Sequence, residues 1–362
     1  MEVNENDIDM VQIYVESIIL GENCRNKDLI RAATVRGYAK EVNKIFELRN
    51  LPPPINMGSK ECPIYTLIYN LEQEENIAKQ RKPITEAMAA RFIQRGERAH
   101  FLSKEALASD ITVMNREFGA RAAEFLQTTP FKVDQHEYPS GRKVNKAMGR
   151  SWFTAYDKYD RVIKDPVRDR KKVAYIMITW LIQKNRRNGE ECYFYKNEKC
   201  LRLCTVNAIL NMFERAQKLG QAETDPMCFY RDRKGRTRYL TRQEMTDYIR
   251  SVAKELYPHM TKADLAYYSC HSFRVWAAVL LHEAGKNGDY IKIRLRWVSE
   301  AYRVYLRNTK NTAKLHNVAV EENAQRIDFS LANLPDTLDD NWVTDDEDSD
   351  MQDYNDDDTN ED

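Results

Sequence analysis

The most informative stretch of the sequence is Cys270-His-Ser-Phe-Arg-Val-Trp-Ala-Ala-Val-Leu-Leu-His-Glu-Ala-Gly285, followed by Arg294-Leu-Arg-Trp-Val-Ser-Glu-Ala-Tyr-Arg-Val-Tyr-Leu-Arg307. His271 and Arg274 are three residues apart at the start of a predicted helix over 272–284, so their side chains point the same way. The free backbone N–H groups at a helix start favour an anion. An HxxR pair alone is ordinary on surface helices, but this one predicts a site shaped for a phosphate.

Two aromatic residues, Trp297 and Tyr305, follow this predicted helix. The order His271, Arg274, Trp297 and Tyr305 resembles the C-terminal signature of the tyrosine recombinases, the phage integrase family, in which an HxxR precedes a His or Trp and then the nucleophilic Tyr. The phrase RWVSEAYRVYLR looks most like the integrases of eukaryotic mobile elements, including Crypton-like ones. Tyr302 is the rival nucleophile, but it follows Trp297 too closely for the family spacing.

The resemblance also requires residues upstream. An earlier helix should carry Gly-x-Arg-x-x-Glu, and Gly119-Ala-Arg121-Ala-Ala-Glu124 supplies it before a predicted β-ribbon. The family places a lysine on that ribbon, and Lys184 is the candidate. Because Arg121 and Lys184 are far apart in the sequence, three other lysines compete for this role: Lys164, Lys171 and Lys172.

Two positions depart from the family pattern. Arg296 precedes Trp297 where a glycine is common, and Trp276 follows the HxxR region where a small residue is frequent. Close approaches of the backbone are therefore expected to differ at these two places.

The chemistry implied by the resemblance is transfer at a phosphodiester, which needs neutralised phosphate oxygens, a nucleophile and a proton donor. Arg121 and Arg274 would clamp the phosphate with their planar guanidinium groups. Tyr305 would attack the phosphorus, forming a 3′-phosphotyrosine and freeing a 5′-hydroxyl that Lys184 protonates.

The remaining candidates have supporting roles in the same resemblance. His271 would act as an acid/base partner or hydrogen-bond donor to the phosphate, Trp297 would donate its indole N–H or buttress the pocket, and Glu124 would brace an arginine. The sequence has no acidic triad and no His/Cys cluster at ligand spacing, so we expect no metal and no cofactor. The expected catalytic residues are Arg121, Lys184, His271, Arg274, Trp297 and Tyr305, with Glu124 supporting.

The N-terminal part predicts a small helical domain. Apolar residues over 26–50 lie near one helical face, and Leu51-Pro-Pro-Pro54 ends that helix. Further apolar segments lie at Val11–Leu20 and Ile64–Leu71. The basic stretch Lys79-Gln-Arg-Lys-Pro83 precedes a helix start at Ile84-Thr85-Glu86, so we expect a core-binding, DNA-binding domain at 1–82.

Residues 83–334 predict a mixed catalytic domain. Helices are expected at 85–97, 104–127, 205–219, after the capping box Thr241-Arg-Gln-Glu244, at 272–284 and at 300–307. Strand-like runs lie at 152–156, 174–183 and 191–195, and the last two flank a hairpin at 184–189 that ends in Asn-Gly. The predicted fold class is α+β, mainly α, with a small antiparallel β-sheet, as in tyrosine recombinases.

Charge is distributed unevenly along the chain. Of 56 acidic residues, 14 lie in 336–362, which has no Lys or Arg, so residues 1–335 carry 56 basic and 42 acidic side chains. We expect 335–362 to be an acidic disordered tail and the basic body to bind DNA. The basic clusters expected at the phosphate backbone are Arg168, Arg170, Lys171 and Lys172; Arg186 and Arg187; and Arg231, Arg233, Lys234, Arg236, Arg238 and Arg242.

Composition excludes several protein classes. The longest apolar run, Ala174–Ile182, is too short to span a membrane, and the acidic N-terminus differs from a signal peptide. The seven cysteines include no CxxC pair, which argues against a disulfide framework or zinc knuckle. We expect an unexported protein without a small-molecule substrate, nuclear in a eukaryote and cytoplasmic otherwise; 168–172 is equally compatible with a nuclear-import signal.

The resulting hypothesis is a site-specific recombinase or integrase that cuts and rejoins double-stranded DNA. The resemblance implies a homotetramer on paired sites, with Ala319–Leu334 packing onto a neighbour. Two alternatives stay open. One is a catalytically silent DNA-binding protein derived from such an enzyme, and the other is type IB topoisomerase-like relaxation, which shares the chemistry without exchanging strands.

Overall fold

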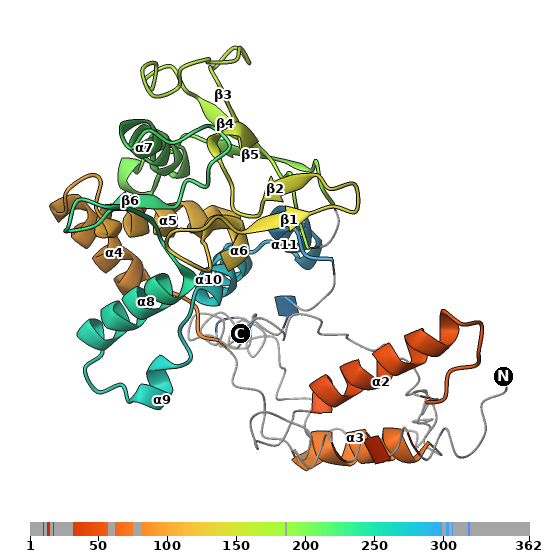
Figure 1. Cartoon of the computed structure of the whole chain (residues 1–362). Helices are drawn as coiled ribbons and strands as arrows, with labels where there is room; N and C mark the ends of the chain where they lie inside the picture. The colour runs from red at the N-terminus through yellow and green to blue at the C-terminus, as the bar shows by residue number, and fades with distance from the viewer. Residues whose placement is uncertain are drawn as a thin grey trace, which may run out of the picture. The chain divides into compact units, whose positions relative to one another are not determined.

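The computed structural model describes residues 32–56, 62–74, 81–184 and 187–298, together with the single residues 10, 13, 14, 17, 302, 303, 306 and 318. The chain divides into two compact units, Met1–Lys79 and Gln80–Asp362 (Figure 1). Its fold is mainly helical α+β with small antiparallel sheets, which confirms the predicted fold class. The functional roles expected for 1–82 and 83–334 remain predictions. The expected tail at 335–362 and the segment 319–334 lie outside the described residues.

The first unit contains the helix pair α2 (Ala32–Glu47) and α3 (Pro63–Glu74), while the expected segment 11–20 falls almost wholly outside the described residues. Val35 and Ala39 of α2 are buried with Ile64 and Ile68 of α3. Helix α2 ends before the predicted proline stop.

The second unit begins with a capped helix pair. Helix α4 (Glu86–Arg98) starts at Thr85, whose Oγ1 accepts the Met88 N–H at 3.2 Å, and α5 (Lys104–Phe118) starts at Ser103 in the same manner. Helix α5 contacts α4, α7 (Thr205–Lys218) and α10 (His271–Glu283), so the core forms around it.

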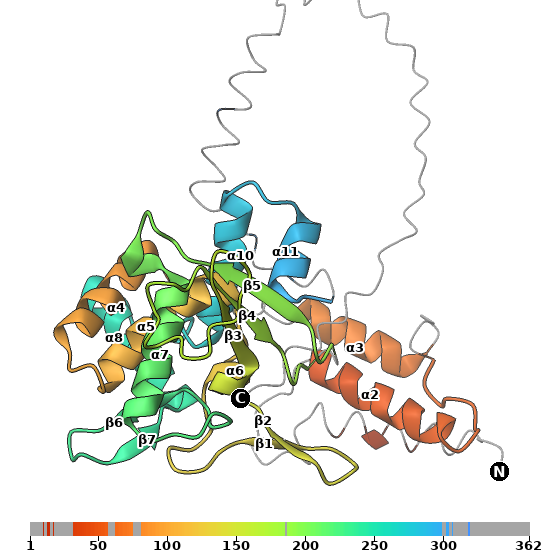
Figure 2. The same ribbon diagram turned by 90° about the horizontal axis from the view of Figure 1, so that it is seen from above.

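Four more helices complete the part of this unit that the structure describes. They are α6 (Ala122–Phe125), α8 (Arg242–Leu256), α9 (Lys262–Leu265) and α11 (Gly288–Leu295), with 3₁₀ turns η1 (Arg150–Trp152) and η2 (Leu201–Leu203). The predicted capping box of α8 is confirmed, because Thr241 Oγ1 accepts the Glu244 N–H and Glu244 accepts the Thr241 N–H. Figure 2 shows α10 and α11 side by side. The expected helix at 300–307 lies mostly outside the described residues.

The expectation of one helix over 104–127 is wrong. Helix α5 ends at Phe118, because Gly119 adopts a left-handed conformation with φ of 50° and closes the helix with its N–H on the Asn115 carbonyl. A glycine at this position is the common helix stop. The chain then turns and begins the short helix α6 after Arg121.

The predicted β-ribbon is present as a three-stranded antiparallel sheet of β3 (Phe153–Tyr156), β4 (Tyr175–Thr179) and β5 (Glu191–Tyr195), in the order β3-β4-β5. Ile178 is opposite Phe153, and Ile176 is opposite Phe194. These four side chains are buried, so this face of the sheet packs on the core.

Strand β4 is shorter than the predicted run 174–183. Beyond it, Trp180 makes one more backbone pair, donating to the Glu190 carbonyl at 2.9 Å and accepting from the Gly189 N–H at 2.8 Å. Its side chain is buried in the core. In the loop between β4 and β5, the Gln183 N–H then bonds to the Asn188 side chain instead of to a backbone carbonyl. The backbone ladder therefore does not extend to Gln183.

Two hairpins of three-residue strands were not expected from the sequence. Strand β1 (Gln135–Glu137) pairs with β2 (Lys143–Asn145), and β6 (Phe229–Arg231) pairs with β7 (Thr237–Tyr239). Such short strands offer too few residues for an alternating pattern to be recognised. No helix in the described part of the chain is long and apolar enough to cross a membrane.

Candidate functional site

The break at Gly119 positions the first candidate arginine. A Cβ at this glycine would come within 3.0 Å of Leu295 and 3.1 Å of Ala277, so glycine allows the end of α5 to approach both α10 and α11. Two residues later, Arg121 is the N-cap of α6 in extended conformation. The motif therefore requires its glycine for close packing and its arginine at a turn.

Glu124 receives hydrogen bonds from Arg121 through both carboxylate oxygens. The Arg121 backbone N–H donates to Oε2 at 2.8 Å, and Arg121 Nη1 donates to Oε1 at 3.3 Å. Glu124 is 5% exposed, whereas the Arg121 side chain keeps 14% of its surface accessible. Glu124 thus contacts Arg121, and part of the Arg121 side chain stays accessible.

Arg296 is the site residue that the sequence analysis missed. It is 1% exposed, and its guanidinium grips Glu124 with Nη1 on Oε1 at 3.2 Å and Nη2 on Oε2 at 2.9 Å. Its Cζ lies 3.3 Å from the ring centroid of Trp180, and its Nη1 also donates to Gln183 Oε1 at 3.1 Å. This planar fork matches a carboxylate in a way that a lysine does not.

The backbone of Arg296 shows why the residue is unusual. It caps the C-terminus of α11 with φ of 59°, a conformation that favours glycine. A non-glycine residue held in this region costs on the order of 1 kcal/mol or more. The sequence signal was an arginine where the family that the sequence resembles commonly has glycine, and it identified only a departure and not the partner.

The Glu124 carboxyl is strongly acidic. Burial by itself raises its pKa, but the charges of Arg296, Arg121 and Arg274 and the hydrogen bonds from Arg296 outweigh burial and lower the pKa from 4.5 to about 2. Glu124 is therefore ionised at neutral pH. Three arginines act on one carboxylate, which leaves an excess of positive charge among these four side chains.

Arg274 comes to the same place from α10. Its Nη1 donates to the Gly119 carbonyl at 2.7 Å, and its Cζ lies 4.0 Å from the ring centroid of Trp297. Both side chains are buried, and His271 lies one turn earlier on α10, half-buried. The structure thus brings Arg121, Glu124, Arg274 and Trp297 together from segments that are distant in sequence.

Of the expected nucleophile Tyr305 and its rival Tyr302, the structure describes only Tyr302. Tyr305, the expected nucleophile, lies outside the described residues. Tyr302 is 2% exposed and belongs to a cluster with Ile291, Leu295 and Trp297. A Cβ at Gly288 would fall 1.9 Å from the Tyr302 hydroxyl, so this ring lies directly against the start of α11.

The candidate lysines lie at opposite ends of β4. Lys184 is exposed in the loop that follows the strand, next to Gln183, which accepts from Arg296. Lys171 and Lys172 lie shortly before β4, and the third rival, Lys164, is exposed earlier in the same connection from β3 to β4. The Arg296 hydrogen bond therefore connects the arginine cluster to the loop of Lys184.

Comparisons with known proteins give a fold likeness at low identity. No family model and no curated protein matches the sequence. Among solved structures, the chain is similar to the Tn1549 transposon integrase in complex with circular intermediate DNA, with a TM-score of 0.46, 10% identity, and coverage of 88% of this chain and 87% of that one. It is also similar to XerA recombinase, with a TM-score of 0.38, 13% identity, and coverage of 88% and 85%.

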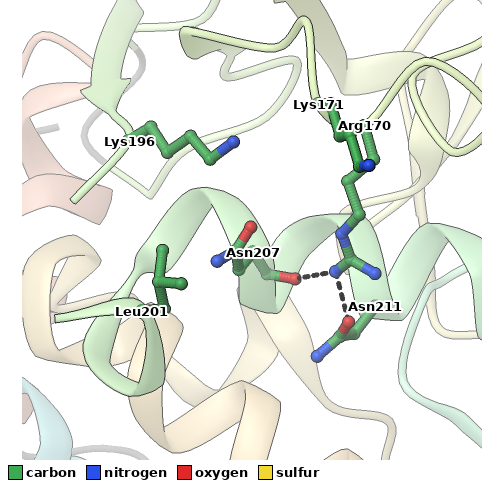
Figure 3. A pocket seen from close by; sticks show the side chains of 6 residues that line it. All are labelled: Arg170, Lys171, Lys196, Leu201, Asn207 and Asn211. Carbon is green, nitrogen blue, oxygen red and sulfur yellow. Dashed lines mark hydrogen bonds between the residues drawn. The ribbon is translucent and has the colours of Figure 1, made fainter. Parts of the chain in front are cut away.

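The basic cluster at 168–172 is partly committed to internal contacts. Arg168 and Lys172 pair with Asp169 at 3.2 and 2.9 Å. Arg170 donates to the Asn207 carbonyl at 2.9 Å and to the Asn211 side chain, and Figure 3 shows it reaching toward α7 while Lys196 enters from the other side. This shallow pocket, which Lys171 and Leu201 also line, has a volume of about 400 Å³.

The second basic cluster surrounds the β6–β7 hairpin. Arg236 pairs with Asp232 at 3.0 Å, and Arg238 lies between Asp232 and Glu244 and over the Phe131 ring. Arg231, Arg233 and Lys234 are exposed beside them. Arg187 is exposed in the Lys184 loop, and Arg186 lies outside the described residues. A role of these residues in DNA binding remains a prediction.

No group of three His, Cys, Asp or Glu side chains in the described part of the chain is arranged to hold a metal ion. The positive charge of this site comes from Arg121, Arg274 and Arg296.

Proposed function

We propose that this protein breaks and rejoins duplex DNA as a tyrosine recombinase or integrase, through a 3′-phosphotyrosine intermediate and without a metal ion. The observation that carries the proposal is the convergence of Arg121 and Arg274 on Glu124, with Arg296 as a third cation. A phosphodiester would balance the excess positive charge, and guanidinium groups match its oxygens in geometry.

The proposed reaction proceeds in balanced steps. The Tyr305 hydroxyl gives up its proton to water as its oxygen attacks the phosphorus, a phosphotyrosine bond forms, and the bond from phosphorus to the 5′ oxygen breaks. Lys184 supplies the proton that this leaving oxygen takes up. Arg121 and Arg274 neutralise the charge that develops on the non-bridging oxygens, and His271 donates a hydrogen bond to one of them. In the rejoining step a 5′-hydroxyl passes its proton to the neutral Lys184 amine and attacks the phosphotyrosine. The bond from phosphorus to the tyrosine oxygen then breaks, and Tyr305 takes up a proton from water.

Trapping of the covalent intermediate tests this proposal. A nicked suicide substrate, from which the 5′ fragment dissociates after cleavage, should yield a denaturation-resistant adduct in excess chelator, with the phosphate mapping to Tyr305. Tyr305→Phe should abolish the adduct, and Tyr302→Phe is the matched control that should keep it. An adduct formed by Tyr305→Phe, or formed only after magnesium is added, would overturn the mechanism.

The same assay separates the alternatives. DNA binding without any adduct would identify a catalytically silent DNA-binding protein. Adduct formation with relaxation of a supercoiled plasmid, but without exchange between two sites on it, would identify a topoisomerase. Recombination of the two-site plasmid is the result expected here, together with the tetramer that such exchange requires.

A further inference from the structure

Gln183 connects the arginine cluster to the loop that carries Lys184. It is 6% exposed, and its Oε1 accepts a hydrogen bond from Arg296 Nη1 at 3.1 Å. Lys184 is the next residue in the chain and is exposed. A buried amide therefore directly precedes the candidate proton donor and is held by the arginine that also grips Glu124.

The other polar atoms of Gln183 close the same loop on itself. Its backbone N–H donates to Asn188 Oδ1 at 2.7 Å, and its Nε2 donates to Glu190 Oε2 at 3.1 Å and to the Arg187 carbonyl. Gln183 thus ties the first half of the loop to the second. Its position relative to Arg296 then sets the position of the whole loop base.

We propose, resting on the function proposed above, that Arg296 and Gln183 are positioning residues that align Lys184 with the leaving 5′ oxygen. Arg296 performs two tasks with one rigid fork. It holds Glu124, which keeps the accessible part of the Arg121 guanidinium for the phosphate, and it holds Gln183, which keeps the Lys184 loop in register with that phosphate. The phosphate clamp and the proton donor are thereby coupled through one buried side chain.

This coupling favours Lys184 over the rival lysines. Lys164, Lys171 and Lys172 all precede β4, whereas Lys184 follows it and adjoins the residue that Arg296 holds. The geometry also explains why arginine occupies a backbone position that suits glycine, because a glycine there would contact neither Glu124 nor Gln183.

A change of leaving atom distinguishes proton delivery from phosphate binding. When the bridging 5′ oxygen of the substrate is replaced by sulfur, the leaving group is a thiolate, which is far less basic than an alkoxide and needs no proton. A variant that has lost only proton delivery should regain its rate on the sulfur substrate. A variant that has lost the phosphate clamp should stay slow on both substrates.

The key variants are Gln183→Met, which removes the amide at nearly constant length, and Lys184→Met. On the oxygen substrate we expect Lys184→Met to lose on the order of 100-fold or more in cleavage rate, and Gln183→Met to lose up to about 100-fold through misplacement. Both should approach the wild-type rate on sulfur. Arg296→Met should regain only part of its rate, because Glu124 is then expected to pair more closely with Arg121.

Two controls complete the design. Arg121→Met represents loss of the clamp and should be slow with either leaving atom. Arg215→Met removes another buried arginine, paired with Asp110 at 2.7 Å, and should leave the ratio of the two rates as in wild type. Hydrogen exchange should show faster exchange of the amides at 181–190 in Gln183→Met and Arg296→Met, but not in Arg215→Met.

The outcomes are separable. If wild type forms no adduct on either substrate, the proposed function is wrong and the coupling falls with it. If wild type cleaves and Lys184→Met is rescued by sulfur while Gln183→Met is not, the positioning role is overturned and the function stands. Unchanged exchange at 181–190 in both Gln183→Met and Arg296→Met would also overturn it. Rescue of both Gln183→Met and Lys184→Met supports the coupling.

Discussion

Two buried arginine–carboxylate pairs in the second unit differ in the direction in which the pKa of the carboxyl group is shifted. Arg296 binds Glu124 at 2.9 Å and Arg215 binds Asp110 at 2.7 Å, and both arginine side chains are 1% exposed. Yet the pKa of Glu124 is lowered to about 2, whereas burial raises the pKa of Asp110 above 3.8 in spite of Arg215 and Asn211.

The difference lies in how many cations each carboxylate faces. Asp110 faces the buried Arg215, which the Phe101 carbonyl also holds at 2.9 Å, and more weakly the partly exposed Arg170, which itself pairs with Glu214 at 3.7 Å. Glu124 faces Arg296, Arg121 and Arg274 together. A balanced pair is sufficient to join α5 to α7, whereas an excess of arginines leaves charge for an anion to balance. The number of arginines around a buried carboxylate is therefore more informative about function than the distance between the paired charges.

The largest expected effect concerns DNA cleavage. Replacing Arg274 with Met removes a proposed phosphate clamp, and we expect cleavage to fall by about 100-fold to 1,000-fold, as for other groups that stabilise developing charge. Arg215→Met should leave the cleavage rate of the folded protein within a few-fold of wild type. Single-turnover rates at matched folded fractions measure both. Equal losses in the two variants would remove the functional distinction between the pairs.

The next effect is on stability at neutral pH. Glu124→Gln mimics the protonated carboxyl, so the lowered pKa predicts a loss of about 3 kcal/mol, at 1.36 kcal/mol for each pKa unit. Asp110→Asn mimics a form that burial already favours, and it should cost clearly less. Urea unfolding of both variants at pH 7 measures the difference. A larger loss in Asp110→Asn would show that surplus arginines do not govern the Glu124 pair.

The two pairs should also respond oppositely to acid. Because the folded pKa of Glu124 is depressed, its stabilisation is present above pH 4.5 and is lost as the pH falls toward 2. Because the folded pKa of Asp110 is raised above 3.8, its contribution is full below that value and is lost as the pH rises through the folded pKa. The measurement is the unfolding midpoint of wild type, Glu124→Gln and Asp110→Asn from pH 2 to 7. The midpoint of Glu124→Gln should approach that of wild type as the pH falls. Parallel curves for all three proteins would contradict this prediction.

The smallest expected effect concerns the positive charge of the body outside the arginine cluster. Residues 336–362, which carry 14 acidic side chains, are expected to compete with DNA for the basic body. Their deletion should tighten binding to random duplex most at low salt, with the difference shrinking as the Debye length falls from about 10 Å at 0.1 M to 3 Å at 1 M. Fluorescence anisotropy over this range is the measurement. Equal affinities throughout would leave the tail a solubilising role only.

Local chemistry was predictable from the sequence wherever adjacent residues interact. Thr85 and Thr241 start helices because their hydroxyls accept backbone N–H groups three residues on, and the alternation at 191–195 belongs to a strand with one buried face. Arg274 could be selected as a candidate because its spacing from His271 follows helix geometry. Arg121 and Glu124 could be selected because they match the pattern of the family that the sequence resembles.

The tertiary structure alone decided which of these residues meet, and Arg296 shows why. Its local sequence indicates only a helix end with an arginine in place of the common glycine, whereas its partners Glu124 and Gln183 are distant in the chain. The break at Gly119 depends likewise on Leu295 and Ala277 closing around it. Spacing along the chain is a local property, but the pKa of a buried carboxylate depends on every charge that folding brings near it, so the surplus at Glu124 appears only when α6, α10 and the end of α11 are packed together.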